Sequence, residues 1–288
     1  MKKICIIGAG HAFNYQYQAL KDLGYDILVC DINADKLKGY DHTITNYHDI
    51  PEDYELILIS TPPITHYEII KYLYNKNKKI ICEKPLVTTK KELDELEKHN
   101  YSFYNILHFS FGDEVEYFIK SKYSKENPVY IKIHINDPYI ENNHIKKEQL
   151  VLNGSYLDET INPLSALKRI YQKDIRYQKA YKFVYEGDSY DYESISKFSM
   201  GDTEIDVFVK WNDQNDHSKY IDIYFEKYVI RLDSINRSVI NLTTNEIIYQ
   251  NHEKRMYKHY LNAFKDYEKI KENSHDAIKL NREILRGV

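Results

Sequence analysis

The sequence predicts two domains, an α/β domain with a doubly wound parallel sheet and an α+β domain with an open, mainly antiparallel sheet and helices on one face. Residues 1–122 alternate short apolar runs with helical patterns, as in a parallel sheet with crossover helices. Residues 123–288 contain runs that alternate with a period of two. The 288 residues suffice for two such domains. We place the boundary after residue 122, with the C-terminal helices able to pack back on the first domain.

Composition and charge exclude several classes of protein. Charged residues make up 29% of the chain and the net charge is −4, so no overall field attracts nucleic acid or acidic lipid. No apolar run approaches the length of a membrane span, and Ile4–Ile7 is too short for a signal peptide. Cys5, Cys30 and Cys82 lie in apolar runs, and their spacing fits no zinc site. We therefore expect a cytoplasmic protein with buried thiols and no metal.

The first elements of the chain are a strand, a glycine-rich turn, a helix and a second strand. Lys3–Ile7 is the apolar run of a buried strand, and Asn14–Leu23 has its apolar residues at helical spacing. The turn Gly8–Ala12 lies between them. Asp26–Cys30 is the second strand, and Asp31 follows it directly, about 20 residues after the glycines. This order is the context that a dinucleotide-binding turn requires.

Each residue of that turn has an expected role at a dinucleotide. Gly8 permits the tight turn, and Gly10 lets the backbone approach a pyrophosphate. The helix that follows His11 and Ala12 would stabilise the phosphates with its N-terminus. Asp31 would accept hydrogen bonds from the ribose hydroxyls of adenosine and repel a 2′-phosphate. The predicted cofactor is therefore NAD, with NADP disfavoured.

The third glycine of the dinucleotide pattern is replaced by Phe13. That glycine normally allows close packing of helix on strand. Phe13 either widens the gap between the helix and the strand or points into it. A tight strand-to-helix turn that binds no nucleotide is the alternative interpretation of this segment.

The alternation of strands and helices continues to about residue 107. The next expected elements are a strand, a helix, a strand, a helix capped by Thr88 or Thr89, and a strand: Leu56–Ile59, His66–Lys76, Lys79–Cys82, Lys90–Lys98 and Tyr101–Leu107. Glu83-Lys84-Pro85 follows the third of these strands. Ligands bind outside the carboxyl ends of the strands in such sheets, so Lys84 is expected where chemistry occurs. A surface Glu–Lys pair at the start of a loop is the alternative.

Taken together, these motifs resemble the glucose–fructose oxidoreductase and inositol dehydrogenase family (Gfo/Idh/MocA). The matching segments are Gly8-Ala9-Gly10, Asp31, Ser60-Thr61-Pro62 with His66, Glu83-Lys84-Pro85 and Phe103-Tyr104-Asn105. The resemblance implies that Thr61 and Pro62 lie against the nicotinamide ribose. It also implies that Lys84 contacts this ribose and the reacting oxygen of the substrate. We include His66 and Glu83 among the cofactor-binding residues. His108 stands where the family often has Arg, and we assign it no role.

The second half of the chain predicts an antiparallel sheet. After the helix Asp113–Lys122, alternating runs are separated by turns with Gly, Asp and Asn: Val129–Ile135, Ile175–Tyr185, Ser194–Phe198, Glu204–Trp211 and Tyr220–Leu232. The chain ends in the predicted helices Lys254–Lys271 and Ser274–Arg286. One face of this sheet carries many Tyr, Ile and Phe residues. The resemblance implies that this face joins subunits into a homodimer or homotetramer.

A segment between the first two of these strands carries further candidate site residues. Asn153–Pro163 aligns with the family's Gly-x-x-x-Asp-x-Gly-x-His pattern. Asp158 matches the acid, and Asn162 stands where the family's dehydrogenases place the His that relays the proton. Asn does not titrate, so Asn162 is no general base, although it can bind a sugar hydroxyl. Alternatively, Asn162 caps a helix that begins with Pro163. If the helix begins near Tyr156, Asp158 and Asn162 share one face.

The resemblance implies a dehydrogenase or reductase acting on a secondary alcohol or ketone of a sugar, sugar nucleotide or cyclitol. NAD would carry the hydride, Lys84 would transfer the proton, and Asp158 would orient Lys84 or a substrate hydroxyl. Two alternatives remain at this stage: a catalytically impaired NAD-binding sensor or scaffold, and a lyase or hydrolase that oxidises its substrate transiently with tightly bound NAD. The loops that select the substrate, among them Asp137–His144, carry no readable code.

Overall fold

The computed structural model describes residues 2–99, 103–252, 255–265 and 270–288. The chain forms two compact units. Unit 1 comprises Met1–Leu107 and Met256–Asn281, and unit 2 comprises His108–Arg255 and Arg282–Val288. Residues 108–122, which we expected in the first domain, lie in unit 2 because the helix there packs on the second sheet.

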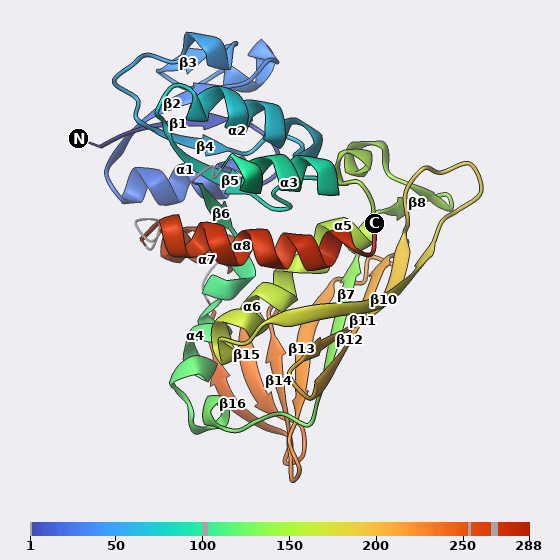
Figure 1. Ribbon diagram of the computed structural model, residues 1–288. Helices are drawn as coiled ribbons and strands as arrows, with labels where there is room; N and C mark the ends of the chain where they lie inside the picture. The colour runs from blue at the N-terminus through green and yellow to red at the C-terminus, as the bar shows by residue number, and fades with distance from the viewer. Residues whose placement is uncertain (1, 100–102, 253–254, 266–269) are drawn as a thin grey trace. The chain divides into compact units, whose positions relative to one another are not determined.

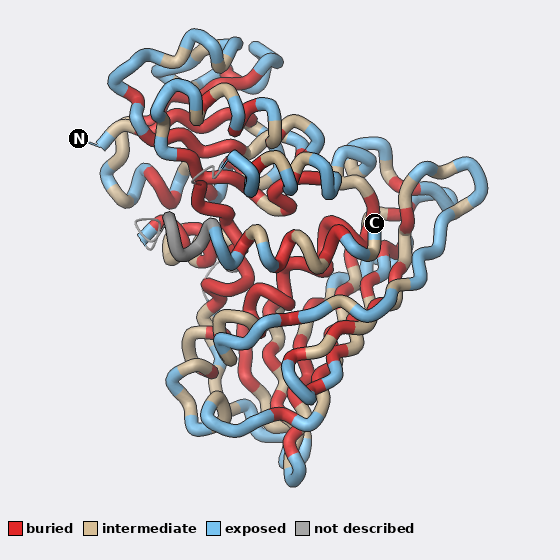
Figure 2. Tube along the Cα trace, viewed as in Figure 1, coloured by how far each residue is buried: buried red, intermediate tan, exposed pale blue. Residues whose placement is uncertain are grey.

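The core of unit 1 is a six-stranded parallel sheet with the strand order β3-β2-β1-β4-β5-β6 (Figure 1). Its strands are β1 (Lys2–Ile7), β2 (Tyr25–Cys30), β3 (Thr43–Ile44), β4 (Leu56–Ile59), β5 (Lys79–Glu83) and β6 (Tyr104–Ile106). The order reverses between β1 and β4, which is the switch point where doubly wound sheets bind ligands. Figure 2 shows β1, β2, β4, β5 and β6 as mostly buried, whereas the short β3 at the edge is more exposed. The predicted doubly wound fold of the first domain is thus confirmed.

Three helices connect the strands of unit 1, and two more come from the C-terminal part of the chain. They are α1 (Phe13–Asp22), α2 (His66–Tyr74), α3 (Lys90–Lys98), α7 (Arg255–Lys265) and α8 (Ile270–Leu285). The cap of α3 is Thr89, which forms a capping box with Glu92. The predicted residues Tyr101, Lys254 and 266–269 lie outside the described part of the chain.

Unit 2 is built on an eight-stranded sheet with the order β10-β11-β12-β7-β13-β14-β15-β16. Its strands are β7 (Tyr130–Asp137), β10 (Ile175–Phe183), β11 (Glu193–Met200), β12 (Thr203–Trp211), β13 (Ser218–Tyr224), β14 (Val229–Asp233), β15 (Ser238–Asn241) and β16 (Glu246–Gln250). Neighbours pair antiparallel, except that β7 and β12 are parallel. A separate small ribbon pairs β8 (Ile140–Glu141) with β9 (His144–Ile145).

The predicted run Tyr220–Leu232 is wrong as a single strand. The chain turns between β13 and β14, where the Phe225 N–H donates to the Tyr228 carbonyl. The strands β15 and β16 were also missed, because their short segments show little alternation. The predicted open, mainly antiparallel sheet is nevertheless confirmed.

Three helices cover one face of the unit 2 sheet. They are α4 (Asp113–Lys120), α5 (Ser155–Glu159) and α6 (Ile161–Tyr171). Helix α4 packs on β14 and β15, and α5 packs on β11 and β12. Inward residues of the central strands, such as Ile133 and Val207, are fully buried, whereas alternate residues such as His134 and Phe208 on the other face are half-buried. Buried and intermediate positions therefore alternate along these strands in Figure 2. The period of two in the sequence of these strands therefore arises because one face of the sheet is covered and the other is not, as the sequence predicted.

Candidate active site

The glycine-rich turn of unit 1 lies against the end of β4. Gly8 has φ +101°, and a Cβ atom there would come within 2.6 Å of the Ser60 carbonyl oxygen. Gly8 is therefore required by the fold itself, both for its backbone conformation and for the close approach of two turns. This contact brings the turn after β1 beside the Thr61-Pro62 turn after β4.

Gly10 and the start of α1 leave room for a ligand. Gly10 is exposed, and a Cβ atom there would meet only the Ser60 carbonyl oxygen, at 3.8 Å. His11 is exposed and Ala12, the N-cap of α1, is half-buried. The first turn of α1 has neither a side-chain cap nor an acidic residue. The positive end of the helix is thus available to a pyrophosphate, which fits the predicted cofactor.

Asp31 follows β2 and has two backbone partners. One carboxylate oxygen accepts from the Ala9 N–H at 2.7 Å, and the other accepts from the Asn33 N–H at 2.8 Å. The Lys36 ammonium lies 3.8 Å away. A carboxylate has about four acceptor sites, so Asp31 keeps capacity for ribose hydroxyls while it holds the glycine-rich turn. Two exposed apolar side chains, Ile32 and Ile64, follow β2 and β4 and offer a surface for a planar base.

Phe13 is buried in a cluster of three aromatic rings. Its ring centroid lies 5.6 Å from that of Tyr17 and 5.3 Å from that of Tyr40, edge-on to the latter. Tyr40 comes from the loop between β2 and β3. The aromatic side chain at the third glycine position thus packs α1 against this loop.

Glu83 and Lys84 stand at the carboxyl end of β5. Glu83 is buried, and its carboxylate accepts from Gln16 Nε2 at 2.7 Å and from the Lys84 N–H at 3.1 Å. Tyr260 of α7 is a third partner. Burial raises the pKa of Glu83, and these donors oppose that shift. Glu83 therefore anchors the turn that presents Lys84, whose side chain is half-buried.

His66 connects the two turns that carry Thr61 and Lys84. Its ring is fully buried, with Nε2 2.9 Å from the Thr61 carbonyl oxygen and Nδ1 2.9 Å from the Pro85 carbonyl oxygen. Burial lowers the pKa of His66, and these carbonyls oppose the shift. Since one ring spans both turns, His66 fixes the Thr61-Pro62 segment relative to Lys84-Pro85. All ten predicted cofactor residues thus lie at one edge of the unit 1 sheet.

Asp158 and Asn162 lie in unit 2, on α5 and α6, and both are buried. Helix α5 begins at Ser155, whose hydroxyl donates to Asp191 at 2.6 Å. The interpretation of Asn162 as a helix cap is wrong. Thr160 precedes α6 in helical conformation, so Asn162 is already inside the helix, and its Nδ2 lies 3.4 Å from Glu159 Oε2.

Sequence reasoning missed a charged cluster beside these residues. Lys219 of β13 lies 2.7 Å from Asp137 Oδ2 at the end of β7 and 3.0 Å from Glu159 Oε1 at the end of α5. A signal was present in the sequence: Lys219 shares the strand parity of Ile221 and Ile223, which predicts a core-facing side chain. A lysine at such a position requires buried partners.

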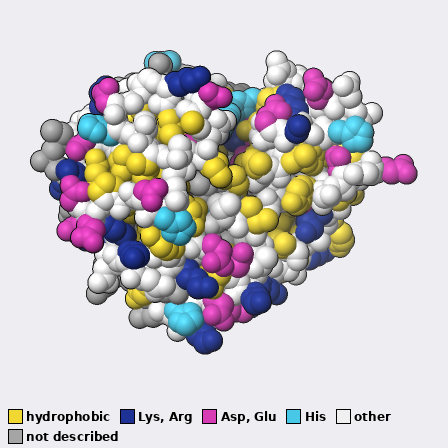
Figure 3. All heavy atoms as spheres, turned by 90° about the horizontal axis from the view of Figure 1, so that it is seen from above, with side chains coloured by type: hydrophobic (Ala, Val, Ile, Leu, Met, Phe, Trp, Pro, Cys, Tyr) yellow, Lys and Arg dark blue, Asp and Glu magenta, His cyan; other side chains and the backbone are white. Residues whose placement is uncertain are grey.

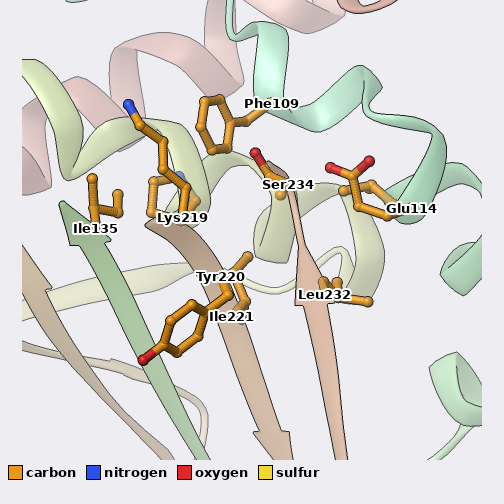
Figure 4. Close-up of a pocket in the computed structure, with 11 residues that line it drawn as sticks. Phe109, Glu114, Ile135, Lys219, Tyr220, Ile221, Leu232 and Ser234 are labelled. Carbon is orange, nitrogen blue, oxygen red and sulfur yellow. The ribbon is translucent and has the colours of Figure 1, made fainter. Parts of the chain in front are cut away.

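Figure 4 shows how Lys219 borders a small cavity of unit 2, its ammonium group beside the Phe109 ring. Tyr220 points to the opposite face of the sheet. The cavity is mostly apolar, and its volume of about 10 Å³ is on the scale of one water molecule. It is thus a packing gap next to the charged cluster, too small for a sugar.

The surface and the remaining described residues add three observations. On the face shown in Figure 3, basic and acidic side chains are interspersed, with no patch of one sign. Among the described residues, no three His, Cys, Asp or Glu side chains are grouped so as to hold a metal ion. In the same part of the chain, no helix has the length and apolar character needed to cross a membrane.

Comparison with known proteins identifies the class of the N-terminal domain. Residues 2–107 match the family model described as "Oxidoreductase family, NAD-binding Rossmann fold" (GFO_IDH_MocA). Two uncharacterized oxidoreductases of Schizosaccharomyces pombe are 30% identical over 107 residues and 45% identical over 42 residues. These matches span 33% and 15% of this chain, and only 29% and 11% of the respective relatives.

Solved structures resemble the chain over nearly its whole length. A UDP-N-acetylglucosamine 3-dehydrogenase from Acidithiobacillus ferrooxidans has a TM-score of 0.79 at 12% identity, covering 99% of this chain and 96% of that one. A myo-inositol 2-dehydrogenase from Lactobacillus plantarum has a TM-score of 0.74 at 16% identity, covering 98% and 94%. An Agrobacterium radiobacter oxidoreductase in complex with NAD⁺, L-tartaric acid and magnesium has a TM-score of 0.74 at 15% identity, covering 99% and 94%.

Residues 2–107 therefore have the sequence and the fold of the NAD-binding Rossmann domain of an oxidoreductase family. More particularly, residues 2–107 match the Gfo/Idh/MocA family model, and the solved structures named above share the fold of the chain. The resemblance predicted from the motifs is confirmed.

Proposed function

We propose that this protein is an NAD-dependent oxidoreductase that acts on a secondary alcohol or ketone of a sugar, sugar nucleotide or cyclitol. One observation carries the proposal. Asp31, the open N-terminus of α1 and Lys84 follow strands of one parallel sheet and therefore lie together at the same edge of unit 1. Two solved structures of similar fold are described as a sugar-nucleotide dehydrogenase and a cyclitol dehydrogenase.

The residues of the edge fit the parts of NAD one by one. Gly10 and the N-terminus of α1 would hold the pyrophosphate, Asp31 the adenosine ribose, and the Thr61-Pro62 turn the nicotinamide ribose. Bound NAD supplies hydride transfer at its nicotinamide ring. Lys84 would hold and move the proton of the reacting oxygen, with its turn fixed by Glu83 and His66.

Cofactor preference is tested by calorimetry with NAD⁺ and NADP⁺. We expect NAD⁺ to bind more tightly, because the Asp31 carboxylate repels a 2′-phosphate, although Lys36 partly offsets that charge. Asp31→Ser should shift the ratio of the two affinities toward NADP⁺. Asp35→Ser is the matched control, since that acid is 79% exposed and pairs with Lys38. Tighter binding of NADP⁺ by the unmodified protein would overturn the preference.

The role of Lys84 is tested by turnover of myo-inositol and UDP-N-acetylglucosamine with NAD⁺. Lys84→Met should lower the rate by roughly 10²–10⁴-fold while NAD⁺ affinity stays within a few-fold. Lys79→Met, at the exposed start of the same strand, is the control and should retain full activity. Asn162→Ala should cost less, since an amide contributes a hydrogen bond of about 1 kcal/mol. Normal turnover by Lys84→Met would remove Lys84 from the mechanism.

We further propose a cytoplasmic homodimer or homotetramer joined through the outer face of the unit 2 sheet. Half-buried aromatic and apolar side chains on this face support the proposal, among them Ile195, Phe208 and Tyr220. The free, buried thiols of Cys5, Cys30 and Cys82 are compatible with a reducing compartment. Light scattering should give a mass above 34.5 kDa, and Phe208→Glu should reduce it toward that value. A monomer at micromolar concentration would contradict this arrangement.

A further inference from the structure

The loop between β2 and β3 carries the charged groups expected at the adenosine ribose. It runs from residue 31 to residue 42 and includes a short 3₁₀ helix at Ala34–Leu37. Asp31 Oδ1 accepts from the Asn33 N–H at 2.8 Å, so the loop itself helps to orient this carboxylate. The Lys36 ammonium lies 3.8 Å from Asp31 Oδ2, and its side chain is 47% exposed. The position of the loop therefore sets how Asp31 and Lys36 are presented to a ligand.

Three aromatic rings join this loop to helix α1. Phe13 and Tyr17 belong to the helix, and Tyr40 belongs to the loop. The ring centroids of the three pairs are 5.0–5.6 Å apart, and Tyr40 is edge-on to both rings of the helix. Edge-to-face pairs have a preferred geometry and stabilise beyond the burial of their area. This aromatic cluster therefore fixes Tyr40 relative to the first two turns of α1.

The backbone of the loop is shaped for this contact. Gly39 has φ +92°, a conformation that residues with a side chain rarely adopt. A Cβ atom at Gly39 would meet nothing within 4 Å, so the backbone conformation, and not lack of space, favours glycine there. The N–H of Tyr40 donates to the Leu37 carbonyl at 3.3 Å. The chain thus turns immediately before the residue that packs on Phe13.

Phe13 has a different task from the glycine that it replaces. That glycine allows close packing of helix on strand. The Phe13 ring is 3% exposed and makes an edge-on contact with Tyr40 at 5.3 Å, which a glycine would not provide. The third position of the dinucleotide pattern thus attaches the loop that follows Asp31.

We propose that Phe13 is a positioning residue for cofactor choice: through Tyr40 it holds the loop so that Asp31, and not Lys36, meets the 2′ position of the adenosine ribose. The inference rests on the proposed function. When the aromatic cluster is broken, the loop is free to move and Asp31 loses the fixed Asn33 donor. The Lys36 ammonium then approaches a 2′-phosphate, and the preference for NAD falls.

The first test needs no cofactor. Tyr40→Leu changes a half-buried loop residue, and Phe13→Leu keeps an apolar side chain in the core, so both variants should fold. By hydrogen exchange with mass spectrometry, the amides of residues 33–42 should exchange on the order of tenfold faster in each variant, whereas those of α3 should not change. Tyr72→Leu is the matched control, because Tyr72 is also half-buried and edge-on to a ring of another loop, that of Tyr47 at 5.5 Å. Unchanged exchange of residues 33–42, or equally faster exchange in α3, overturns the attachment.

The second test measures cofactor choice by calorimetry with NAD⁺ and NADP⁺. Phe13→Leu and Tyr40→Leu should each lower the ratio of NAD⁺ to NADP⁺ affinity on the order of tenfold. The double variant should lower it by little more than either single variant, since both break one contact. A general loss of stability would weaken both cofactors alike and leave the ratio unchanged. Tyr72→Leu should not change the ratio.

Adding Lys36→Ala to Tyr40→Leu should restore the preference for NAD⁺, because the ammonium that meets the 2′-phosphate is gone. An unchanged ratio in Phe13→Leu and Tyr40→Leu, or no restoration by Lys36→Ala, overturns the role of Phe13 in cofactor choice. If the unmodified protein binds neither cofactor while exchange of the loop still rises in both variants, the proposed function fails and the attachment of the loop stands.

Discussion

Two buried glutamates, one in each unit, are held in opposite ways. Glu83 in unit 1 accepts hydrogen bonds from neutral donors, the Gln16 amide and the Lys84 backbone N–H among them. Glu159 in unit 2 faces the Lys219 ammonium, which it shares with Asp137. The first arrangement surrounds one carboxylate with hydrogen-bond donors, whereas in the second one ammonium contacts two buried carboxylates.

The difference has consequences for what each site can do. These donors hold Glu83 in place, which suits an anchor for the turn that carries Lys84. Glu159 instead depends on the charge of Lys219, so its contribution to stability is electrostatic. The contrast between the two glutamates can be tested by the free energy of unfolding of variants in each unit.

Lys219→Met should have the largest effect, a loss of about 3–5 kcal/mol in the free energy of unfolding, because two buried carboxylates lose an ammonium that contacts both. Urea denaturation at neutral pH measures it. Lys210→Met removes a pair with Glu193 on an exposed lysine and should cost about 0–1 kcal/mol. Equal losses for the two variants would contradict the buried, shared nature of the Lys219 contacts.

Gln16→Met should cost about 1.5–3 kcal/mol, because a buried carboxylate loses a donor. The cost should depend on pH. Burial raises the pKa of Glu83, and loss of Gln16 raises it further. The contribution of Glu83 to stability is fully present below the ordinary pKa of glutamate and is lost as pH rises through the folded value. The loss of stability in Gln16→Met should therefore grow as the pH rises from the ordinary pKa of glutamate to the folded pKa of Glu83.

Urea titrations of both proteins from acid to neutral pH measure that growth. Gln18→Met is a suitable control, since Gln18 lies on the same helix, is exposed and contacts Asp22 on the surface. A deficit for Gln16→Met that shrinks as pH rises would show that Glu83 does not rely on this amide.

Replacement of Glu83 or Glu159 by glutamine should have the smallest effects on stability, but it compares the two carboxylates most directly. Glu83→Gln turns an amide N–H₂ toward another donor and should cost about 1–3 kcal/mol. Glu159→Gln removes one buried charge and leaves Lys219 paired with Asp137, so stability should change by less than about 1 kcal/mol. Thermal or urea unfolding of both variants compares them. A larger loss of stability for Glu159→Gln than for Glu83→Gln would contradict this contrast between the two carboxylates.

The sequence by itself determined the topology of unit 1 and the place of its cofactor edge. Buried parallel strands appear as continuous apolar runs, and ligands bind where such strands end, so Gly8, Asp31 and Lys84 could be placed from local order alone. Strand alternation likewise predicted the open sheet of unit 2, although it missed the turn at Phe225–Tyr228.

Tertiary structure alone decided which side chains meet. Glu159 and Lys219 are 60 residues apart in sequence, and Gln16 and Glu83 are 67 apart. Periodicity shows which way a side chain faces but not which partner lies opposite, because that depends on strand order and on the placement of helices. The same limit explains Asn162: its cap-like sequence was overridden because α6 already begins at Ile161. This helix follows directly on α5, which the distant Asp191 holds through Ser155.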